Sequence, residues 1–320
     1  MVNFDEDVKG RHGDIPKYIK GKIKLIFGAI FPATNTFSEI ELKRLKGLYG
    51  DWKEIMIPQI SYFEEILDQI LIYRYLIRSY KDKLMLIVKH KDIEILDNSD
   101  KIGFLISLEG LDALNKPEEI EILYLLGIRS VTLTWNYDNK FASCCTSKKD
   151  YGLTRAGEDL IEMSNELGVI IDVSHASKNS ALETCNISKL PVIASHSNYY
   201  KIKKHNRNFD DEVLEAIRKT GGVIGFTFIT STIGEKADIN QISKHIISVW
   251  ENFGSDILAL GTDFFGIKNT PEHLEDASKI PILIEKLKDK GMSENDIEKL
   301  CWKNAYRIIL QHEIKWKDSI

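Results

Sequence analysis

Short apolar runs alternate along the chain with longer segments in which apolar residues recur every three to four positions. The short runs have the length and composition of buried strands, and the longer segments have the periodicity of amphipathic helices. We predict strands at Leu25–Phe31, Gly103–Leu108, Arg129–Thr134, Val169–Ser174, Val192–Ser195, Val223–Phe228 and Ile257–Thr262. A further apolar run, Leu84–Val88, is either another strand of the sheet or part of a peripheral hairpin.

Helical segments are predicted at Phe37–Tyr49, Ile60–Tyr80, Pro117–Leu126, Gly157–Leu167, Ser180–Thr184, Asp211–Lys219, Ile239–Asn252, Ile280–Lys290 and Glu294–Leu310. Asn115 and Asp210 are expected to cap two of these helices, because their side-chain oxygens accept from first-turn N–H groups. Uninterrupted alternation of strands and helices favours an α/β fold with a parallel sheet, and over about 300 residues it favours a (β/α)8 barrel. Since no linker-like stretch divides the chain, we expect residues 1–320 to form a single barrel domain.

The charge and cysteine content argue against several classes of protein, namely nucleic-acid binders and disulfide-rich secreted proteins. With 43 Lys and Arg against 48 Asp and Glu, the chain has a formal net charge of −5. We therefore expect no nucleic-acid partner, because phosphate contacts require clustered basic residues. No apolar run is long enough to span a bilayer, and the first residues do not resemble a signal peptide. There are four cysteines, of which Cys144 and Cys145 are adjacent, so we expect no disulfide scaffold and a cytoplasmic location.

Three polar residues directly follow predicted strands. Glu109 follows Gly103–Leu108, and His175 and His196 end two strands that lie one βα unit apart. In a parallel barrel the carboxyl ends of the strands converge, so we expect these side chains to meet. Two imidazoles and a carboxylate suit Zn²⁺ or a similar divalent ion. For each residue taken alone, a structural role is the simpler alternative.

Several motifs, taken together, have the pattern of a known family. They are Asp172-Val173-Ser174-His175, Ala194-Ser195-His196-Ser197-Asn198, His205-Asn206-Arg207-Asn208, Gly221-Gly222-Val223 and Gly261-Thr262-Asp263-Phe264. In combination they resemble the membrane (renal) dipeptidase family of zinc metallopeptidases, and within it the soluble prokaryotic or archaeal members. Weaker matches at Asp14–Lys17, Gly127–Thr134 and Gly152–Thr154 extend the resemblance over almost the whole chain.

The resemblance implies a (β/α)8 barrel that holds two zinc ions and hydrolyses dipeptides. It assigns Glu109 as the carboxylate that bridges the metals, and His175 and His196 as ligands of the second metal. It assigns Arg207 to the substrate carboxylate, in keeping with the fork geometry of a guanidinium, and Asp263 to proton transfer. The alternatives are a surface ion pair for Arg207 and a helix N-cap for Asp263. Members of the family are often homodimers, so a homodimer is an expected assembly; no membrane anchor is expected here.

The chain departs from the family pattern near its start. The family holds its first metal with a His-x-Asp pair at the end of the first barrel strand. Asp5-Glu6-Asp7 is one candidate for a degenerate pair, and His12-Gly13-Asp14 is another. The interpretation we favour is that the strand and its ligands are short or missing, which would leave one metal ion.

Two further departures concern the substrate pocket. Trp135 stands where the family commonly has a histidine, and it is expected to form part of the pocket wall as a substrate-binding residue. Phe265 replaces an aspartate of the family pattern. The sequence therefore predicts a metal-dependent dipeptidase in which Asp263 and Glu109 are catalytic. The alternatives are a catalytically impaired relative that binds a ligand or protein, and an amidohydrolase acting on N-acyl amino acids or lactams.

Overall fold

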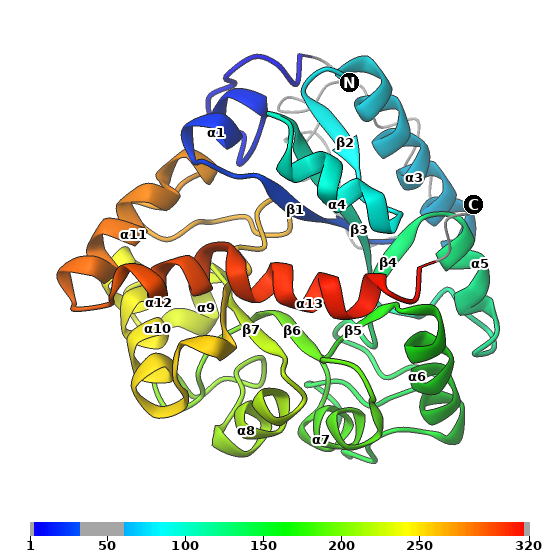
Figure 1. The fold of residues 1–320 in the computed structure, drawn as a ribbon. Helices are drawn as coiled ribbons and strands as arrows, with labels where there is room; N and C mark the ends of the chain where they lie inside the picture. The colour runs from blue at the N-terminus through cyan, green and yellow to red at the C-terminus, as the bar shows by residue number, and fades with distance from the viewer. Residues whose placement is uncertain (1–2, 33–60, 317–320) are drawn as a thin grey trace.

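The structure, a computed structural model, describes residues 3–32 and 61–316. A curled parallel sheet forms its framework, and helices pack around the outside (Figure 1). The spatial order of the strands is β1 (Leu25–Ile30), β3 (Ile102–Glu109), β4 (Ile128–Thr132), β5 (Ile170–Asp172), β6 (Ile193–Ser197), β7 (Val223–Phe226) and β8 (Leu258–Leu260). Each of these strands overlaps a predicted one. The apolar run after Leu84 forms β2 (Leu84–Leu86), which pairs parallel to β3, so the hairpin alternative is wrong.

Helices connect and follow the strands. They are α1 (Ile15–Lys20), α3 (Tyr62–Ser79), α4 (His90–Asp97), α5 (Glu119–Leu125), α6 (Arg155–Leu167), α7 (Lys178–Ile187), α8 (Asp211–Lys219), α9 (Thr230–Ile233), α10 (Ile239–Phe253), α11 (Ile280–Asp289), α12 (Glu294–Glu298) and α13 (Asn304–Glu313). Short 3₁₀ turns lie at η2 (Ser255–Ile257) and η3 (Ala277–Lys279), and a π-helical turn at η4 (Lys299–Lys303). The predicted helix Phe37–Tyr49 lies outside the described residues. No helix in the described ranges combines the length and apolar character that crossing a membrane requires.

One predicted helix cap is wrong, and one predicted helix contains an irregular turn. Asn115 does not cap α5, because its backbone N–H instead donates to the carboxylate of Glu119, the first residue of that helix. The predicted helix Glu294–Leu310 is confirmed as α12, η4 and α13, which follow one another without a break, and η4 is a π-helical turn that was not predicted. After this turn, Asn304 donates its side-chain amide to the carbonyls of Ser255 and Leu258. This contact ties the last helices to the amino end of β8. The predicted cap at Asp210 is confirmed, since its carboxylate accepts from the N–H of Val213 at 3.2 Å.

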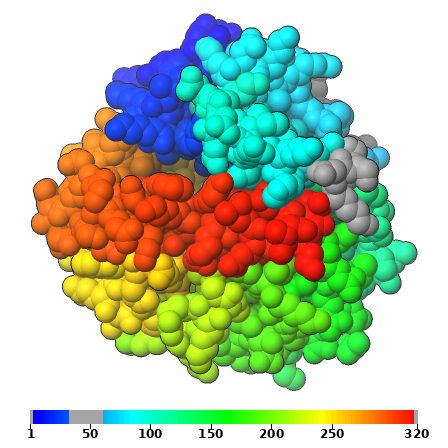
Figure 2. Space-filling view, in the orientation of Figure 1, coloured from blue at the N-terminus to red at the C-terminus, as the bar shows by residue number. Residues whose placement is uncertain are grey.

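The helices after β8 cover the end of the sheet at which the strands begin. Figure 2 shows them, coloured orange to red, crossing this face between the blue N-terminal elements and the yellow and green helices. The core beneath is apolar: Val131 on β4, Ile170 on β5, Ile224 on β7 and Leu258 on β8 are all fully buried. Parallel strands covered on both sides need such continuous apolar runs, which explains why the sequence pattern located them.

The sheet does not close into a complete barrel in the part of the chain that the structure describes. The strand order begins at β1 and ends at β8, and no described strand lies between them. This agrees with the expectation of a first strand that is short or missing. A cavity of about 1160 Å³ extends between these two strands, and Glu109, His196 and Asp263 contribute to its lining.

Side chains replace part of the pairing that a strand in this gap would give to β1. The backbone carbonyl of Lys24 accepts from the N–H of Gly103 on β3. Successive residues of a strand direct their backbone N–H and C=O groups to opposite sides, so those of Ala29 and Phe31 point away from β3. The side-chain amide of Gln69 on α3 donates to the Phe31 carbonyl at 2.7 Å and accepts from the Phe31 N–H at 2.9 Å. The hydroxyl of Tyr73 donates to the Ala29 carbonyl at 3.0 Å. Because unpaired edge groups are costly when shielded from water, these contacts stabilise an otherwise open edge.

Candidate metal centre

Three predicted ligands meet at the carboxyl end of the sheet. Glu109 is the last residue of β3, His196 lies on β6, and His175 follows β5. The Nε2 atom of His175 lies 2.9 Å from Nε2 of His196 and 3.0 Å from Oε1 of Glu109. Nε2 of His196 lies 3.4 Å from the same carboxylate oxygen. The side chains are largely buried, so the contacts are shielded from water.

The backbone holds His175 in an uncommon conformation. Its φ of 64° lies in the left-handed region, which costs a non-glycine residue about 1–3 kcal/mol. The carbonyl of His175 accepts from the N–H of Cys145 at 2.7 Å, and the N–H of Ala176 donates to Val173 at 3.0 Å. These bonds retain the turn and direct the imidazole toward the other two ligands.

The Nδ1 atoms of both imidazoles form hydrogen bonds, which leave the Nε2 atoms free to act as ligands. Nδ1 of His175 lies 2.8 Å from the side-chain oxygen of Asn136, and Nδ1 of His196 lies 2.7 Å from the hydroxyl of Ser195. An Nδ1–H that donates to Asn136 places the lone pair of His175 on Nε2. Two Nε2 lone pairs and a carboxylate oxygen then face one another, and they repel unless a cation lies between them. Tetrahedral ligands at about 2.1 Å from zinc are separated by roughly 3.4 Å, so these three residues fit a divalent ion.

The two imidazoles differ in how readily they bind a proton. Burial, reinforced by the positive charge of Arg207, lowers the pKa of His175 to about 3, so this imidazole is neutral as a metal ligand must be. Burial raises the pKa of Glu109, but the neighbouring imidazoles of His175 and His196 outweigh burial and hold that pKa below its ordinary value. Burial lowers the pKa of His196, but the neighbouring carboxylate of Glu109 outweighs burial and the pKa is raised, so a metal ion that binds here must displace a proton.

Arg207 supplies a buried positive charge beside the ligands. Its Nη2 donates to the carbonyl of His196 at 3.2 Å, whereas Nη1 is buried and has no hydrogen-bond partner among the described residues. Burial lowers the pKa of Arg207, and the nearby Glu109 and Asp263 oppose this shift. A buried guanidinium without an ion-pair partner in the described ranges rules out the surface ion pair considered above. The free Nη1 is a donor that an anionic ligand could satisfy.

Asp263 lies on the loop after β8 and lines the same cavity as Glu109 and His196. Its φ is 57°, and its carbonyl accepts from Gly266 in a turn, so no helix begins here and the N-cap alternative is wrong. Burial is the main cause that raises the pKa of Asp263 to about 6, and the negative charge of Glu109 adds to the shift. A carboxyl with this pKa can both hold and release a proton near neutral pH.

Aromatic rings line one side of the centre. The ring of Trp135 lies 6.2 Å from that of His175, 5.0 Å from that of Phe31 and 5.4 Å from that of Tyr137, measured between centroids. Trp135 therefore lies beside a candidate metal ligand, and its role in substrate binding stays a prediction. Phe265, which stands where the family pattern has an aspartate, donates its backbone N–H to Nδ1 of His12 at 2.8 Å.

The N-terminal candidates for a His-x-Asp pair do not join the centre. Asp14 is buried, caps α1 through the N–H of Lys17 at 3.0 Å, and pairs with the Lys17 ammonium at 2.7 Å. Asp7 also pairs with Lys17, and the hydroxyl of Tyr80 donates to Asp5. Within residues 3–32 and 61–316, Glu109, His175 and His196 are the one group of three side chains placed to hold a metal ion. The described chain thus provides ligands for a single ion.

Three residues that support the ligands were not assigned a role from the sequence: Asn136, Asp172 and Ser195. Asn136 directly follows Trp135, and the other two lie within the quoted motifs that contain His175 and His196. For Ser195, its place directly before the predicted ligand His196 is the signal that could have indicated a role, whereas Asn136 and Asp172 adjoin no predicted ligand.

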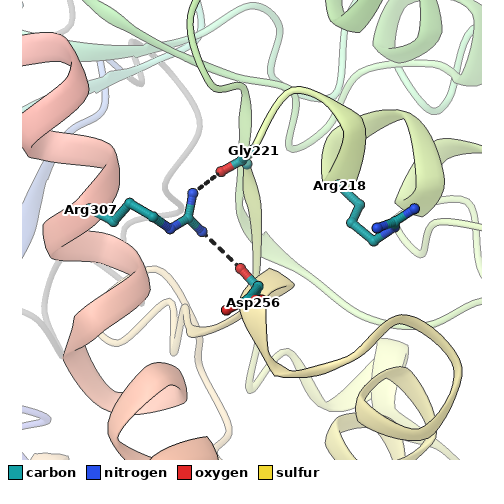
Figure 3. Close-up of a pocket in the computed structure, with 5 residues that line it drawn as sticks. Arg218, Gly221, Asp256 and Arg307 are labelled. Carbon is teal, nitrogen blue, oxygen red and sulfur yellow. Dashed lines mark hydrogen bonds between the residues drawn. The ribbon is translucent and has the colours of Figure 1, made fainter.

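A separate, smaller pocket of about 340 Å³ lies at the amino ends of β7 and β8 (Figure 3). Arg307 reaches from α13 and donates to the carbonyls of Gly221 and of Asp256, the latter at 2.9 Å. Arg218 forms two hydrogen bonds of 2.7 Å with Glu215 on its own helix. Both guanidinium groups are therefore engaged within the fold, and this pocket lacks the convergent ligand atoms of the metal centre.

Comparison with known proteins identifies the family. The model of the membrane dipeptidase family (peptidase family M19) matches residues 1–318. The chain belongs to this family. It is 30% identical to the dipeptidase verJ of Clonostachys rogersoniana, over 93% of this chain and 82% of the relative. It is 32% identical to an uncharacterised dipeptidase of Schizosaccharomyces pombe, over 98% of this chain and 76% of the relative.

The fold of this membrane dipeptidase family member agrees with a solved structure. A metallopeptidase from Rhodobacter sphaeroides, crystallised with a phosphinate mimic of the dipeptide L-Ala-D-Ala, superposes with a TM-score of 0.79 at 21% identity. The alignment covers 95% of this chain and 92% of that protein. The predicted class, an α/β barrel of the metal-dependent hydrolase kind, is confirmed.

Proposed function

We propose that the protein is a metal-dependent dipeptidase that hydrolyses the single peptide bond of dipeptides. The observation that carries this proposal is the convergence of Glu109, His175 and His196 in a chain of the membrane dipeptidase family. Relatives at about 30% identity carry the name dipeptidase, and the R. sphaeroides metallopeptidase holds a dipeptide mimic. We propose zinc as the ion, because imidazole and carboxylate ligands suit it.

The three ligands would hold the ion, which when bound would lower the pKa of a water and polarise the scissile carbonyl. Arg207 binds the carboxylate of the dipeptide through its free Nη1, since a buried guanidinium has no other described anionic partner. Asp263 holds a proton on its carboxyl oxygen and delivers it to the leaving amine. Trp135 shields one side of the pocket from water.

Arg207 also limits the length of the substrate. Its charge acts on Glu109 and Asp263, so the carboxylate that it binds must lie close to the reacting centre. Little room is left for residues beyond the scissile bond, which favours dipeptides over longer peptides. We further propose a cytoplasmic location, consistent with four cysteines that are all free thiols.

The test combines metal content with hydrolysis. We expect protein purified in zinc to contain one ion per chain by elemental analysis and to cleave dipeptides. H175A and H196A remove a ligand and should lower metal occupancy and activity together, by at least about 100-fold in activity. H273A is the matched control, because His273 has an exposed side chain and lies outside the group of ligands. Faster hydrolysis of N-acyl amino acids or lactams than of dipeptides would contradict the substrate assignment.

A catalytically impaired relative is the second candidate, and one observation favours it. The described residues supply ligands for only one ion, and the sheet is open between β1 and β8 beside them. Protein that binds zinc but cleaves neither dipeptides nor other amides would support this candidate over the dipeptidase.

A further inference from the structure

A buried carboxylate lies behind the ligand His196. Asp172, the last residue of β5, is fully buried and accepts four hydrogen bonds. Its Oδ1 accepts from the backbone N–H groups of Ser174 and Ser195, each at 2.8 Å. Its Oδ2 accepts from the hydroxyl of Thr132 at 2.7 Å and from that of Ser195 at 2.5 Å. The carboxylate therefore joins three neighbouring strands at the level of the metal centre.

The donors around Asp172 determine where each proton lies. A carboxylate only accepts, so the single O–H of Ser195 donates to Asp172. The Ser195 oxygen is then an acceptor toward Nδ1 of His196, 2.7 Å away. Nδ1 must carry the imidazole proton, which leaves the lone pair on Nε2, the atom that faces Glu109 and His175. Asp172 thereby selects the tautomer that a metal requires.

We propose that Asp172 is a positioning residue which, through Ser195, fixes the Nδ1–H tautomer of His196 and so sets the affinity of the metal centre. The tautomer follows from the hydrogen bonds alone, whereas the effect on the metal rests on the proposed function. His175 is held differently, because its Nδ1 faces the neutral amide of Asn136. The Ser195 hydroxyl that accepts from His196 is itself polarised by the carboxylate of Asp172, which raises the basicity of this imidazole more than a neutral amide does, so His196 should be the stronger ligand.

The substitution D172N separates positioning from packing, because it preserves the shape of the side chain. The two backbone N–H groups at the Oδ1 position require an acceptor there, so the amide oxygen must face them. The amide NH₂ then faces Ser195 and donates to its oxygen. The Ser195 hydroxyl is then free to donate to Nδ1 of His196, which is nearer, at 2.7 Å, than its other neighbour, the Ser174 hydroxyl at 3.3 Å. This bond moves the imidazole proton to Nε2 and blocks the ligand atom.

The first experiment observes the tautomer directly in metal-free protein. Histidine-selective ¹⁵N NMR at about pH 9, where imidazoles are neutral, distinguishes a protonated Nδ1 from a protonated Nε2. The spectrum of H196Q assigns the His196 signals. We expect Nδ1–H in the parent protein, Nε2–H in D172N and a mixture in S195A. A parent His196 protonated at Nε2 would overturn the proposal without any variant.

The second experiment measures zinc affinity by competition with a chromophoric chelator. We expect D172N and S195A to bind zinc about 10–100-fold more weakly than the parent, the usual effect of losing a group that orients a ligand. S130A is the matched control, since Ser130 is a buried serine on β4 whose hydroxyl has no partner among the described residues. Unchanged affinity in both D172N and S195A, or an equal loss in S130A, would contradict the proposal.

The two experiments distinguish failure of this proposal from failure of the proposed function. A parent protein that binds no zinc contradicts the proposed metal centre, and the tautomer then decides the positioning role alone. Thermal unfolding of the metal-free variants shows whether the substitutions damage the fold. S195A retains the other three hydrogen bonds of Asp172, so its loss of zinc affinity should exceed any loss of stability.

Discussion

At the level of single residues, Arg207 is distinguished by a buried charge with an unsatisfied Nη1. We predict that R207A raises KM for dipeptides about 10–100-fold, because a charged hydrogen bond to a substrate carboxylate contributes roughly 1.5–3 kcal/mol. Arg207 is not one of the three ligand residues, so zinc content should be unchanged. Steady-state kinetics and elemental analysis check both expectations. R218A is the control, since Arg218 pairs with Glu215 on a distant helix; loss of zinc from R207A would refute the assignment.

Single residues also show how far the sequence determines the site. Glu109, His175 and His196 were predicted as neighbours because each ends an apolar run, and parallel strands place such residues at one edge. The supporting roles of Asn136 and Asp172 could not be predicted. They depend on hydrogen bonds across strands, such as the bond from Thr132 to Asp172, and these bonds require the register of β4 against β5. Alternation of apolar and polar residues locates strands but does not determine the register between them.

At the level of elements, the free edge of β1 depends on α3. Gln69 forms two hydrogen bonds with the backbone of Phe31, as a neighbouring strand would. We predict that Q69A lowers the free energy of unfolding by about 1–3 kcal/mol, because it leaves a backbone donor and acceptor unpaired. Q69E retains the acceptor for the Phe31 N–H but places a carboxylate against the Phe31 carbonyl. It should therefore destabilise the protein by a similar amount or more.

Urea denaturation of the parent and both variants checks this expectation. D68A is a suitable control, because Asp68 is the adjacent residue on α3. If Q69A unfolds at the same urea concentration as the parent, the two hydrogen bonds do not stabilise the edge of the sheet.

The elements themselves were predicted well where they are buried and less well where they are not. Every strand from β1 to β8 coincides with an apolar run, since both faces of a parallel sheet are covered. The short helix α4 was missed, because its eight residues contain only two buried positions, Ile93 and Leu96. The π-helical turn η4 within the last helix was also missed. It accompanies the contact of Asn304 with Ser255 and Leu258, which lie far away in the sequence.

At the level of the whole molecule, buried histidines make the fold sensitive to acid. His245 on α10 is fully buried, its Nδ1 accepts from the N–H of Tyr199 at 3.0 Å, and its Nε2 donates to the carbonyl of Ile233 at 2.8 Å. Burial lowers the pKa of His245 to about 4. His312 on α13 is also buried, donates to the Pro191 carbonyl at 3.1 Å, and has a pKa lowered by burial to about 4.

These pKa values determine how stability changes with pH. Between about pH 6.5 and pH 4 the unfolded chain binds a proton at each histidine whereas the folded protein does not, so the free energy of unfolding falls as pH falls. The contribution is fully present above pH 6.5 and is lost progressively down to pH 4. At pH 5 each histidine should cost about 2 kcal/mol relative to pH 7. His175, with a pKa lowered to about 3, adds to the same trend.

We predict that H245Q reduces the difference in unfolding free energy between pH 7 and pH 5 by about 2 kcal/mol, because glutamine does not titrate. The amide of glutamine can still accept from Tyr199, so part of the packing is retained at pH 7. Urea denaturation of metal-free protein at both pH values measures the difference, and subtraction from the parent removes the contribution of His175. H273Q should behave as the parent, because the side chain of His273 is exposed. An H245Q variant with the full pH dependence of the parent would show that His245 binds protons alike in the folded and unfolded protein, and that its burial does not make this fold sensitive to acid.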